Sequence, residues 1–300
     1  MISYINPDLR RAWSGFFDIE VMRKIAIQGY EGCFHHIAAI QYFGRDIDII
    51  PCDTFRKVAS SVKNGETNMG LMAIENSIAG SILPNYNILQ NCNVQVTGEA
   101  YLRIRQMLMV NRGVELEDIR EVESHHMALL QCTDYLDKHR WQLIESTDTA
   151  LSAAQLQASG SRTKAVIASS LAADLFNLDI VAPDIHTISD NYTRFLRLDY
   201  CDRSQKEPQA GEGGGKASLY FKISNSSGSL YDTLGCFEGL NLNMTKLQSY
   251  PIPTEPWHYI FHVDMEFTEG ANFSKAIERL REHGVEVHIY GVYKKGKDLQ

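Results

Sequence analysis

Short apolar segments alternate with helix-like segments over the first two thirds of the chain, and this alternation limits the possible folds more than any other feature. Apolar runs typical of buried strands occur at 25–27, 47–50, 69–74, 141–145 and 165–167. Segments with apolar residues at helical spacing separate several of them. Strands that alternate with such helices predict an α/β fold with a mostly parallel sheet and helices on both of its faces.

The composition changes after Asp202. Residues 203–216 read RSQKEPQAGEGGGK, with four glycines, one proline and no large apolar side chain. Such a segment predicts a flexible linker between two domains or a long loop. The rest of the chain, 217–300, has the order β-α-β-β-α-β that is typical of ferredoxin-like domains. Its strands are expected at 217–223, 244–250, 258–267 and 285–293, and its helices at 229–240 and 271–283.

Charge and composition exclude several classes of partner. The chain has 29 basic and 37 acidic residues, a net charge of −8, which disfavours binding to nucleic acid or to an anionic membrane surface. No apolar run approaches the roughly 18 residues that a membrane-spanning helix needs. The six cysteines form no C-x-x-C pair. We therefore expect no zinc or dithiol site, and a cytoplasmic protein with reduced thiols.

Residues 1–21 do not fit the strand and helix pattern. Arg10 and Arg11 are compatible with a twin-arginine export signal, but Asp18 and Glu20 interrupt the apolar stretch that such a signal requires. We expect an N-terminal extension in front of a domain that begins near Met22.

Four polar clusters follow predicted strands, and ligands of open α/β sheets bind at the carboxyl ends of strands. The clusters are a glycine turn at 28–34, the segment Glu-Asn-Ser-Ile-Ala-Gly at 75–80, the pair 124–126 and 146–147, and the segment Asn-Tyr-Thr-Arg-Phe-Leu-Arg-Leu at 191–198. Each also has a purely structural interpretation. In the same order, these are a tight turn, a solvated loop, two helix N-caps and a surface arginine on an edge strand.

No motif indicates a metal or a cofactor. His35 and His36 are adjacent, as are His125 and His126, and adjacent residues do not share a helix face. The phosphate-binding patterns G-x-x-x-x-G-K-[ST] and G-x-G-x-x-G are absent, and so is the nucleophile motif G-x-S-x-G. We expect neither a metal nor a cofactor.

Together the four clusters resemble the prephenate dehydratase family, with an ACT domain at the C-terminus. The most specific family signature, N-x-T-R-F, is intact at 191–195. The resemblance extends from about Met22 to Tyr293. The other family motifs have counterparts at 29–39, 73–80, 124–128, 146–150 and 166–169.

The resemblance implies an architecture. The dehydratase domain, 22–202, is expected to have two lobes like a periplasmic binding protein, with the four clusters in the cleft between them. One lobe is expected at 22–98 plus 190–202 and the other at 99–185. The linker 203–216 and the ACT domain 217–300 follow. Because only about 21 residues precede the domain, the resemblance implies the monofunctional form, without chorismate mutase.

It also implies a reaction. Prephenate loses CO₂ and a ring hydroxyl to give phenylpyruvate in phenylalanine biosynthesis, and no cofactor is needed because aromatisation drives the reaction. Thr193 is implied as the hydrogen-bond donor to the leaving hydroxyl, and Arg194 as the bidentate partner of a substrate carboxylate. Glu75 is expected to orient its neighbours rather than face a dianion.

The remaining family residues are implied to bind the substrate. Asn76, Ser77 and Thr147, with N–H groups at Gly80 and at the helix after Gly32, complete the expected anion site. Four departures from the family pattern concern the shape of this pocket: Tyr30 for proline, Cys33 for a hydroxyl residue, His35 for serine and Gln106 for a common histidine. The other residues expected to bind substrate are Cys33, Ser124, His125, Ser146, Asn191 and Phe195.

Two alternative functions remain open. Arogenate dehydratase runs the same chemistry on the amino analogue, and the sequence does not separate a keto from an amino substrate. A non-catalytic amino-acid or keto-acid sensor has the same domain order, but the presence of Thr193 and Arg194 favours the enzyme.

Regulation is expected at the ACT domain. ACT domains commonly pair through a sheet edge, which predicts a homodimer or homotetramer. Where phenylalanine-regulated relatives have P-G-A-L, this chain has Ser227, Gly228, Ser229 and Leu230; where they have E-S-R-P, it has Gln248, Ser249, Tyr250 and Pro251. The second segment loses both charges. We still expect phenylalanine as the effector, because backbone amides after Gly228 can bind a carboxylate; the alternative is a purely structural domain.

Overall fold

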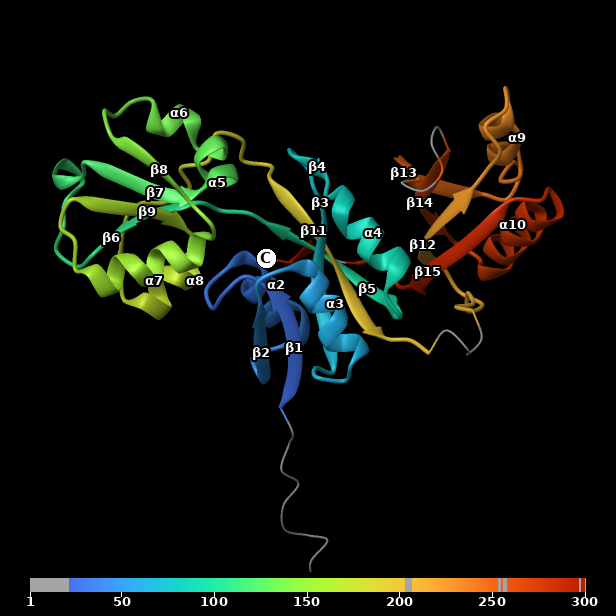
Figure 1. The fold of residues 1–300 in the computed structure, drawn as a ribbon, viewed down its shortest axis with the longest axis horizontal. Coiled ribbons are helices and arrows are strands. Elements are labelled where there is room, and N and C mark those ends of the chain that lie inside the picture. Colours follow the sequence, from blue (N-terminus) through green and yellow to red (C-terminus); the bar gives the residue numbers. More distant parts are fainter. Residues whose placement is uncertain (1–21, 203–206, 253–254, 256–257, 297, 300) are drawn as a thin grey trace, which may run out of the picture.

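The computed structural model describes residues 22–202, 207–252, 255, 258–296 and 298–299. The expected extension at 1–21 and residues 203–206 of the expected linker lie outside these ranges. The described chain forms two lobes, each around its own sheet, and a C-terminal unit beside the first lobe (Figure 1). In this part of the chain, no helix is both long and apolar enough to cross a membrane.

The first lobe contains a mixed sheet. Strand β1 is parallel to β2 and β3, whereas β11 runs antiparallel between β3 and β5. The spatial order is β16 (Asp298–Leu299), β5 (Val94–Arg103), β11 (Tyr192–Tyr200), β3 (Met69–Asn76), β1 (Arg23–Gln28) and β2 (Ile47–Cys52), with β4 (Gly80–Ser81) beside β3. Its helices are α2 (Phe34–Phe43), α3 (Phe55–Lys63) and α4 (Leu83–Asn91).

The second lobe is also built on a mixed sheet. Strand β7 is parallel to β8 and β9, and β6 is antiparallel to β9 and β10. The spatial order is β10 (Asp179–Ala182), β6 (Met107–Val110), β9 (Lys164–Ala168), β7 (Glu121–His125) and β8 (Gln142–Ser146). Its helices are α5 (His126–Gln131), α6 (Thr133–Leu136), α7 (Thr149–Ser159) and α8 (Ser170–Phe176), with a 3-10 turn at Leu116–Asp118.

The expected boundary between the lobes, at 98 and 99, is wrong. Strand β5 stays in the first sheet as far as Arg103, because it pairs with β11 from Tyr200 back to Tyr192. The chain therefore crosses to the second lobe at 104–106, directly before β6.

The C-terminal unit has the expected βαββαβ order. Its sheet has the spatial order β13, β14, β12, β15. Helix α9 is shorter than expected and ends at Gly235. The elements are β12 (Gly215–Lys222), α9 (Ser229–Gly235), β13 (Leu242–Pro251), β14 (Tyr259–Phe267), α10 (Gly270–Glu282) and β15 (Glu286–Tyr293).

The described part of the expected linker is attached to this unit. Glu207 forms an ion pair with Arg281 of α10 at 2.6 Å. The backbone of Gly211 lies so close to Gly270 that a methyl group added to Gly270 would be 1.8 Å from the carbonyl oxygen of Gly211. Residues 207–214 are therefore packed against α10 rather than free.

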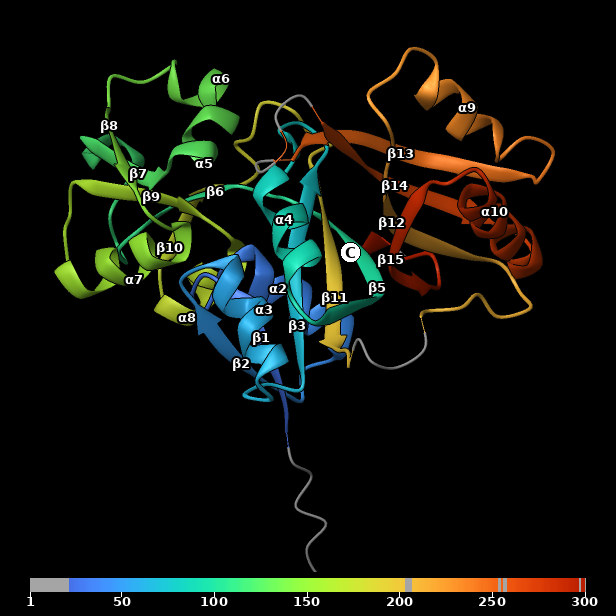
Figure 2. The ribbon, with the colours of Figure 1, turned by 45° about the vertical axis from the view of Figure 1, so that its right-hand side comes forward.

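The C-terminal unit also packs closely on the first lobe (Figure 2). Leu196 and Leu198 of β11 share one apolar cluster with Tyr220 and Tyr290 of the C-terminal unit. The chain end returns to the first lobe, where β16 pairs with β5. One face of β11 is thus covered by elements that include the C-terminal unit.

Candidate functional site

A cleft of about 320 Å³ lies between the two lobes. Both lobes contribute: β3, β11 and the start of α2 from the first, and the starts of α5 and α7 from the second. This volume suits a small organic acid. The expected site residues that line it are Cys33, Asn76, His125, Thr147, Thr193 and Phe195.

The contact between Asn76 and Thr193 gives the cleft an oriented hydroxyl. The Oδ1 atom of Asn76 accepts hydrogen bonds from the N–H groups of Ile78 and Ala79 at 3.0 and 2.9 Å. This fixes the amide, so its Nδ2 atom donates to Thr193 Oγ1 at 3.1 Å. Because the threonine oxygen accepts this bond, its own proton remains available for a ligand.

Ser77 and Asn191 help to fix the positions of Asn76 and Thr193. The Ser77 hydroxyl donates to the carbonyl oxygen of Asp190 at 3.1 Å and accepts from the N–H of Tyr192 at 2.9 Å. Asn191 is fully buried, and its Oδ1 atom accepts from Asn76 Nδ2 at 2.6 Å. Neither belongs to the cleft lining, so the expectation that they touch substrate is replaced by a scaffolding role.

Four further expected residues also lie outside the lining. Gly32 packs against α8, where an added methyl group would lie 3.0 Å from Ala172, and its carbonyl oxygen accepts from Ser169. The Ser124 hydroxyl is buried and donates to the carbonyl oxygen of Ile167 at 2.6 Å. The hydroxyls of Ser146 and Ser152 are hydrogen-bonded to each other. Gly80 supplies a positive φ of 81° in the hairpin after β3.

Three helices, α2, α5 and α7, begin at or beside residues that line the cleft. Among the described residues that line it, none is a lysine or an arginine. Helix α2 begins beside Cys33, a lining residue that makes no side-chain capping bond within the described chain, so the first N–H groups of α2 have no cap from it. The Nδ1 atom of His125 caps the N–H of Met127 at 3.2 Å. Asp148 caps α7 through the N–H groups of Ala150 and Leu151.

The apolar wall includes a neutral histidine. His35 packs edge-to-face on Phe195 with 4.9 Å between ring centres, and its Nε2 atom accepts from the N–H of Ala73 at 3.4 Å. Burial lowers the pKa of His35 to about 3. Burial likewise raises the pKa of the Cys33 thiol to about 12. Both departures from the family pattern therefore add uncharged surface to the cleft.

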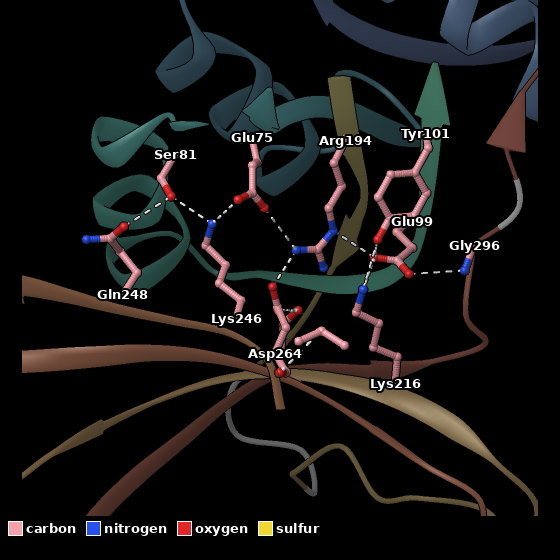
Figure 3. Close-up of polar contacts among 12 residues, drawn as sticks. Glu75, Ser81, Glu99, Tyr101, Arg194, Lys216, Lys246, Gln248, Asp264 and Gly296 are labelled. Atoms are coloured by element: carbon pink, nitrogen blue, oxygen red, sulfur yellow. Dashed lines mark hydrogen bonds and ion pairs between the residues drawn. The ribbon is translucent and has the colours of Figure 1, made fainter. Parts of the chain in front are cut away.

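The expected role of Arg194 is wrong. Its side chain is 5% exposed and belongs to a buried ion cluster (Figure 3), and it is not among the described residues that line the cleft. The guanidinium donates to Glu99 at 2.7 Å, to Asp264 of the C-terminal unit, and to the hydroxyl of Tyr293 at 3.1 Å. The reason is the strand itself: successive side chains point to opposite faces, so Thr193 and Arg194 cannot share one ligand.

Glu75 belongs to the same ion cluster. It pairs with Lys246 at 2.7 Å and lies 3.9 Å from Arg194, outside the cleft. Lys216 pairs with Glu99 at 3.0 Å. The ion cluster, defined by Glu75, Glu99, Arg194, Lys216, Lys246 and Asp264, has three positive and three negative groups.

Asp264 and Arg194 of this cluster keep their charges despite burial. Burial alone would raise the pKa of Asp264, but the charge and hydrogen bond of Arg194, a hydrogen bond from Ser218 and the charge of Lys216 outweigh it and lower that pKa. Burial opposes the charge of Arg194 too, yet Asp264 and Tyr293 hold its pKa well above the usual value. Charged residues within otherwise apolar strands, such as Glu99, are the sequence signal that could have revealed the cluster.

The expected regulatory residues lie on two different elements. Gly228, with a φ of 87°, precedes α9, which begins with Ser229 and Leu230. Gln248 and Ser249 are on β13, and Gln248 Oε1 accepts from the Ser81 hydroxyl of the first lobe at 3.2 Å. Gln248 therefore takes part in the contact between the C-terminal unit and the first lobe.

Two solved structures have the same fold over most of the chain. A structure described as GqqA, a novel type of quorum-quenching acylase, matches with a TM-score of 0.81 and 27% identity, over 91% of this chain and 98% of that one. A prephenate dehydratase from Arthrobacter aurescens, solved in complex with L-Phe, matches with a TM-score of 0.80 and 24% identity, over 90% of this chain and 89% of that one.

Sequence comparison identifies the family. A bifunctional chorismate mutase/prephenate dehydratase of Aquifex aeolicus is 32% identical over 95% of this chain and 77% of its own length. Arogenate dehydratase/prephenate dehydratase 2, chloroplastic, of Arabidopsis thaliana is 32% identical over 90% of this chain and 72% of its own length. The family model for prephenate dehydratase matches residues 25–202, which include both lobes and the cleft between them. The chain is therefore an enzyme of the prephenate dehydratase family.

Proposed function

We propose that the cleft between the two lobes converts prephenate to phenylpyruvate, with Thr193 acting on the leaving hydroxyl. In this reaction, the bond from the ring to its carboxylate breaks and CO₂ leaves. The released electron pair moves through the ring and expels the hydroxyl from the opposite carbon. The prephenate dianion and one proton give CO₂, water and the phenylpyruvate monoanion, so the reaction balances without an oxidant or reductant.

The hydrogen bond from Asn76 to Thr193 is the observation that supports this role. A threonine hydroxyl is a weak acid, so we assign it hydrogen-bond donation to the departing oxygen, with the balancing proton taken from solvent. Donation by Asn76 polarises the threonine hydroxyl and directs its proton toward the cleft. A fixed donor of this kind contributes roughly 10²–10³-fold to turnover.

Neutral donors are proposed to hold the substrate's carboxylates. Arg194 forms ion pairs with Glu99 and Asp264, so it cannot supply the expected bidentate contact with a substrate carboxylate. The N–H groups at the start of α2 and the hydroxyl of Thr147 are left for this task. Phe195, held against His35, supplies a flat apolar surface for the ring.

Substitution at Thr193 tests the proposal. Thr193→Ala should lower kcat by about 10²–10³-fold with little change in KM, because the donor acts mainly in the transition state. Thr193→Ser keeps the hydroxyl and serves as the matched control, with kcat within about tenfold of the unchanged enzyme. The absorbance of the phenylpyruvate product measures the turnover of both variants. An alanine variant with unchanged kcat would contradict the assignment.

We further propose that the C-terminal unit is an ACT domain that binds phenylalanine and inhibits the enzyme in a homodimer or homotetramer. The βαββαβ order supports the domain assignment, and the Arthrobacter relative was solved with L-Phe. Titrating phenylalanine against activity and against oligomer mass tests this. If neither changes up to millimolar phenylalanine, the unit is a structural domain only.

The cleft does not favour acyl transfer by a cysteine nucleophile, one mechanism by which an acylase, as in the name of the GqqA structure, can act. Acyl transfer with a cysteine nucleophile requires a thiolate. Burial raises the pKa of Cys33, the cysteine among the described lining residues, to about 12, so its thiol stays protonated near neutral pH.

A further inference from the structure

A buried hydrogen bond joins the two lobes beside the cleft. The Ser169 hydroxyl, at the start of α8 in the second lobe, donates to the carbonyl oxygen of Gly32 in the first lobe at 2.5 Å. The same oxygen accepts from the N–H of Ala172 at 3.1 Å and so caps α8. Ser169 is fully buried. Its single proton goes to Gly32, because the bond from Ala172 uses a lone pair of the oxygen.

The backbone around this bond is closely packed. Gly32 has a φ of 87°, and an added methyl group would lie 3.0 Å from the Cα atom of Ala172. At Gly29, an added methyl group would lie 3.1 Å from the carboxylate of Asp148, at the start of α7. The glycine turn that leads into α2 therefore packs against the starts of α7 and α8, and Figure 1 shows α8 beside α2.

The chain itself joins the lobes at a different place. It crosses at 104–106 and returns at 183–191, and the two segments are hydrogen-bonded to each other. The N–H of Ile104 donates to the carbonyl oxygen of Asn191 at 2.7 Å. Two lobes that share such a connection can open and close about it. The bond from Ser169 to Gly32 opposes opening, because opening separates its two partners.

Closure decides whether both lobes reach one substrate. The proposed function uses Thr193 and the start of α2 from the first lobe and the hydroxyl of Thr147 from the second. Gly32 precedes Cys33, which is the residue directly before α2. A hydroxyl that holds Gly32 therefore also fixes the start of α2 relative to the second lobe.

We propose that Ser169 is a positioning residue for the dehydratase reaction: its hydroxyl holds Gly32 against the second lobe and keeps the cleft in the closed form that binds substrate. This inference rests on the proposed dehydratase function. Ser169 is not among the described residues that line the cleft, so it acts through Gly32 and the start of α2 rather than by touching substrate.

Two substitutions separate this role from the capping of α8. Ser169→Ala removes the donor and the cap, whereas Ser169→Gly removes the same donor and keeps most of the capping, because glycine is a good N-cap. Both variants should raise KM for prephenate by about 3–10-fold, as expected for one buried hydrogen bond. In both, kcat should stay within about twofold, because bound substrate still favours the closed form. Only the alanine variant should also lose the capping contribution to stability.

Hydrogen exchange measures the contact without reference to activity. The N–H of Gly32 donates to His36 Nδ1 at 3.0 Å, and the N–H of Cys33 donates to the carbonyl oxygen of Tyr30 at 3.1 Å. Without the bond from Ser169, the turn is free to open, so both substitutions should speed exchange at Gly32 and Cys33 by about 3–10-fold. The change would appear in the lobe that does not carry the substitution.

Thr54→Ala is the matched control. Thr54 caps α3 by accepting from the N–H of Lys57 at 3.2 Å, a contact within the first lobe. Its loss should lower stability about as much as the loss of the α8 cap, with KM and the exchange of Gly32 and Cys33 unchanged.

The outcomes separate the two proposals. Absence of turnover by the unchanged enzyme contradicts the proposed dehydratase function, whereas the exchange measurement still tests the contact between the lobes. With turnover present, unchanged KM and exchange in both Ser169 variants overturn the role of Ser169. A higher KM in the alanine variant alone shows that only the cap matters, and a lower kcat with unchanged KM shows that the hydroxyl acts on the chemistry; either result overturns the proposal. An equal rise in KM for Thr54→Ala overturns it too, because a general loss of stability would then explain the effect.

Discussion

Thr193 and Arg194 are neighbours on β11, yet their side chains serve opposite faces of the sheet. Thr193 Oγ1 accepts from Asn76 beside the cleft, whereas the Arg194 guanidinium binds Asp264 of the C-terminal unit. One strand therefore contacts both the proposed site of chemistry and the proposed regulatory unit. A displacement of the C-terminal unit that moves Arg194 would also move Thr193, which gives effector binding a short path to the cleft.

Arg194→Met is expected to affect stability and regulation more than substrate binding. The substitution leaves the buried carboxylates of Glu99 and Asp264 without their main cation, at a cost of about 3–5 kcal/mol in the free energy of unfolding. Urea unfolding measures this loss. At a temperature where the variant is folded, KM should stay within a few-fold of the unchanged enzyme, and inhibition by phenylalanine should weaken.

Asp264→Asn is the matched partner of that experiment, because it breaks the same ion pair from the C-terminal unit. It should reproduce the weakened inhibition. If Arg194→Met raises KM a hundredfold while Asp264→Asn leaves KM unchanged, then Arg194 binds substrate after all and the geometry found here is not the active one.

Asn76→Asp tests whether the direction of the hydrogen bond to Thr193 matters, because aspartate has nearly the same shape as asparagine. The carboxylate still accepts from the N–H groups of Ile78 and Ala79, but it accepts from Thr193 instead of donating, which turns the threonine proton away from the substrate. We expect kcat to fall about 10²-fold with KM nearly unchanged. In the double variant with Thr193→Ala, the two losses should not add, because both remove the same donor; additive losses would show that Asn76 acts elsewhere.

Two buried histidines predict loss of stability in acid. Burial lowers the pKa of His35 to about 3 and that of His262, which lies among Tyr86, Tyr250 and Tyr290, to about 4. Unfolded histidine titrates near 6.5, so below that pH the unfolded chain binds protons that the folded chain does not. Stability is fully present above about pH 6.5 and falls as the pH approaches 4, by up to about 1.4 kcal/mol per pH unit for each histidine.

Unfolding free energies at pH 4.5, 5.5 and 7 measure this slope. His35→Ser, which restores the common family residue, should reduce the slope between pH 4.5 and 5.5 by about one proton. An unchanged slope would show that His35 is protonated in the folded enzyme.

The sequence was sufficient for features that depend on local periodicity. The order of elements in the C-terminal unit and strands β1, β2 and β3 follow from apolar spacing over a few residues. The lobe boundary was not predictable in the same way, because the pairing of β5 with β11 joins residues about a hundred positions apart.

The error at Arg194 has a physical lesson. The family signature groups Thr193 and Arg194 by adjacency, but the two-residue period of a strand separates them, and that rule was applicable to the sequence alone. The partners of Arg194 were not predictable, because Glu99 and Asp264 lie 95 and 70 residues away. Asn76, by contrast, was correctly grouped with Thr193 because both lie at the same end of paired strands.

Gly291→Ala should loosen the C-terminal unit from the first lobe. Gly291 lies on β15 against β5, and an added methyl group would be 1.8 Å from the carbonyl oxygen of Val96, a backbone atom that cannot rotate away. We expect the interface to open, with a melting temperature lower by several degrees and faster limited proteolysis. Gly235→Ala is the matched control, because a methyl group there meets no atom within 4 Å. It should leave both measurements nearly unchanged.

The same variant tests whether the effect of phenylalanine is transmitted through this interface, because Gly291 is not among the described residues that line the cleft. Retained turnover with weakened phenylalanine inhibition would support transmission through the interface. Full inhibition in a variant whose interface has opened would contradict it.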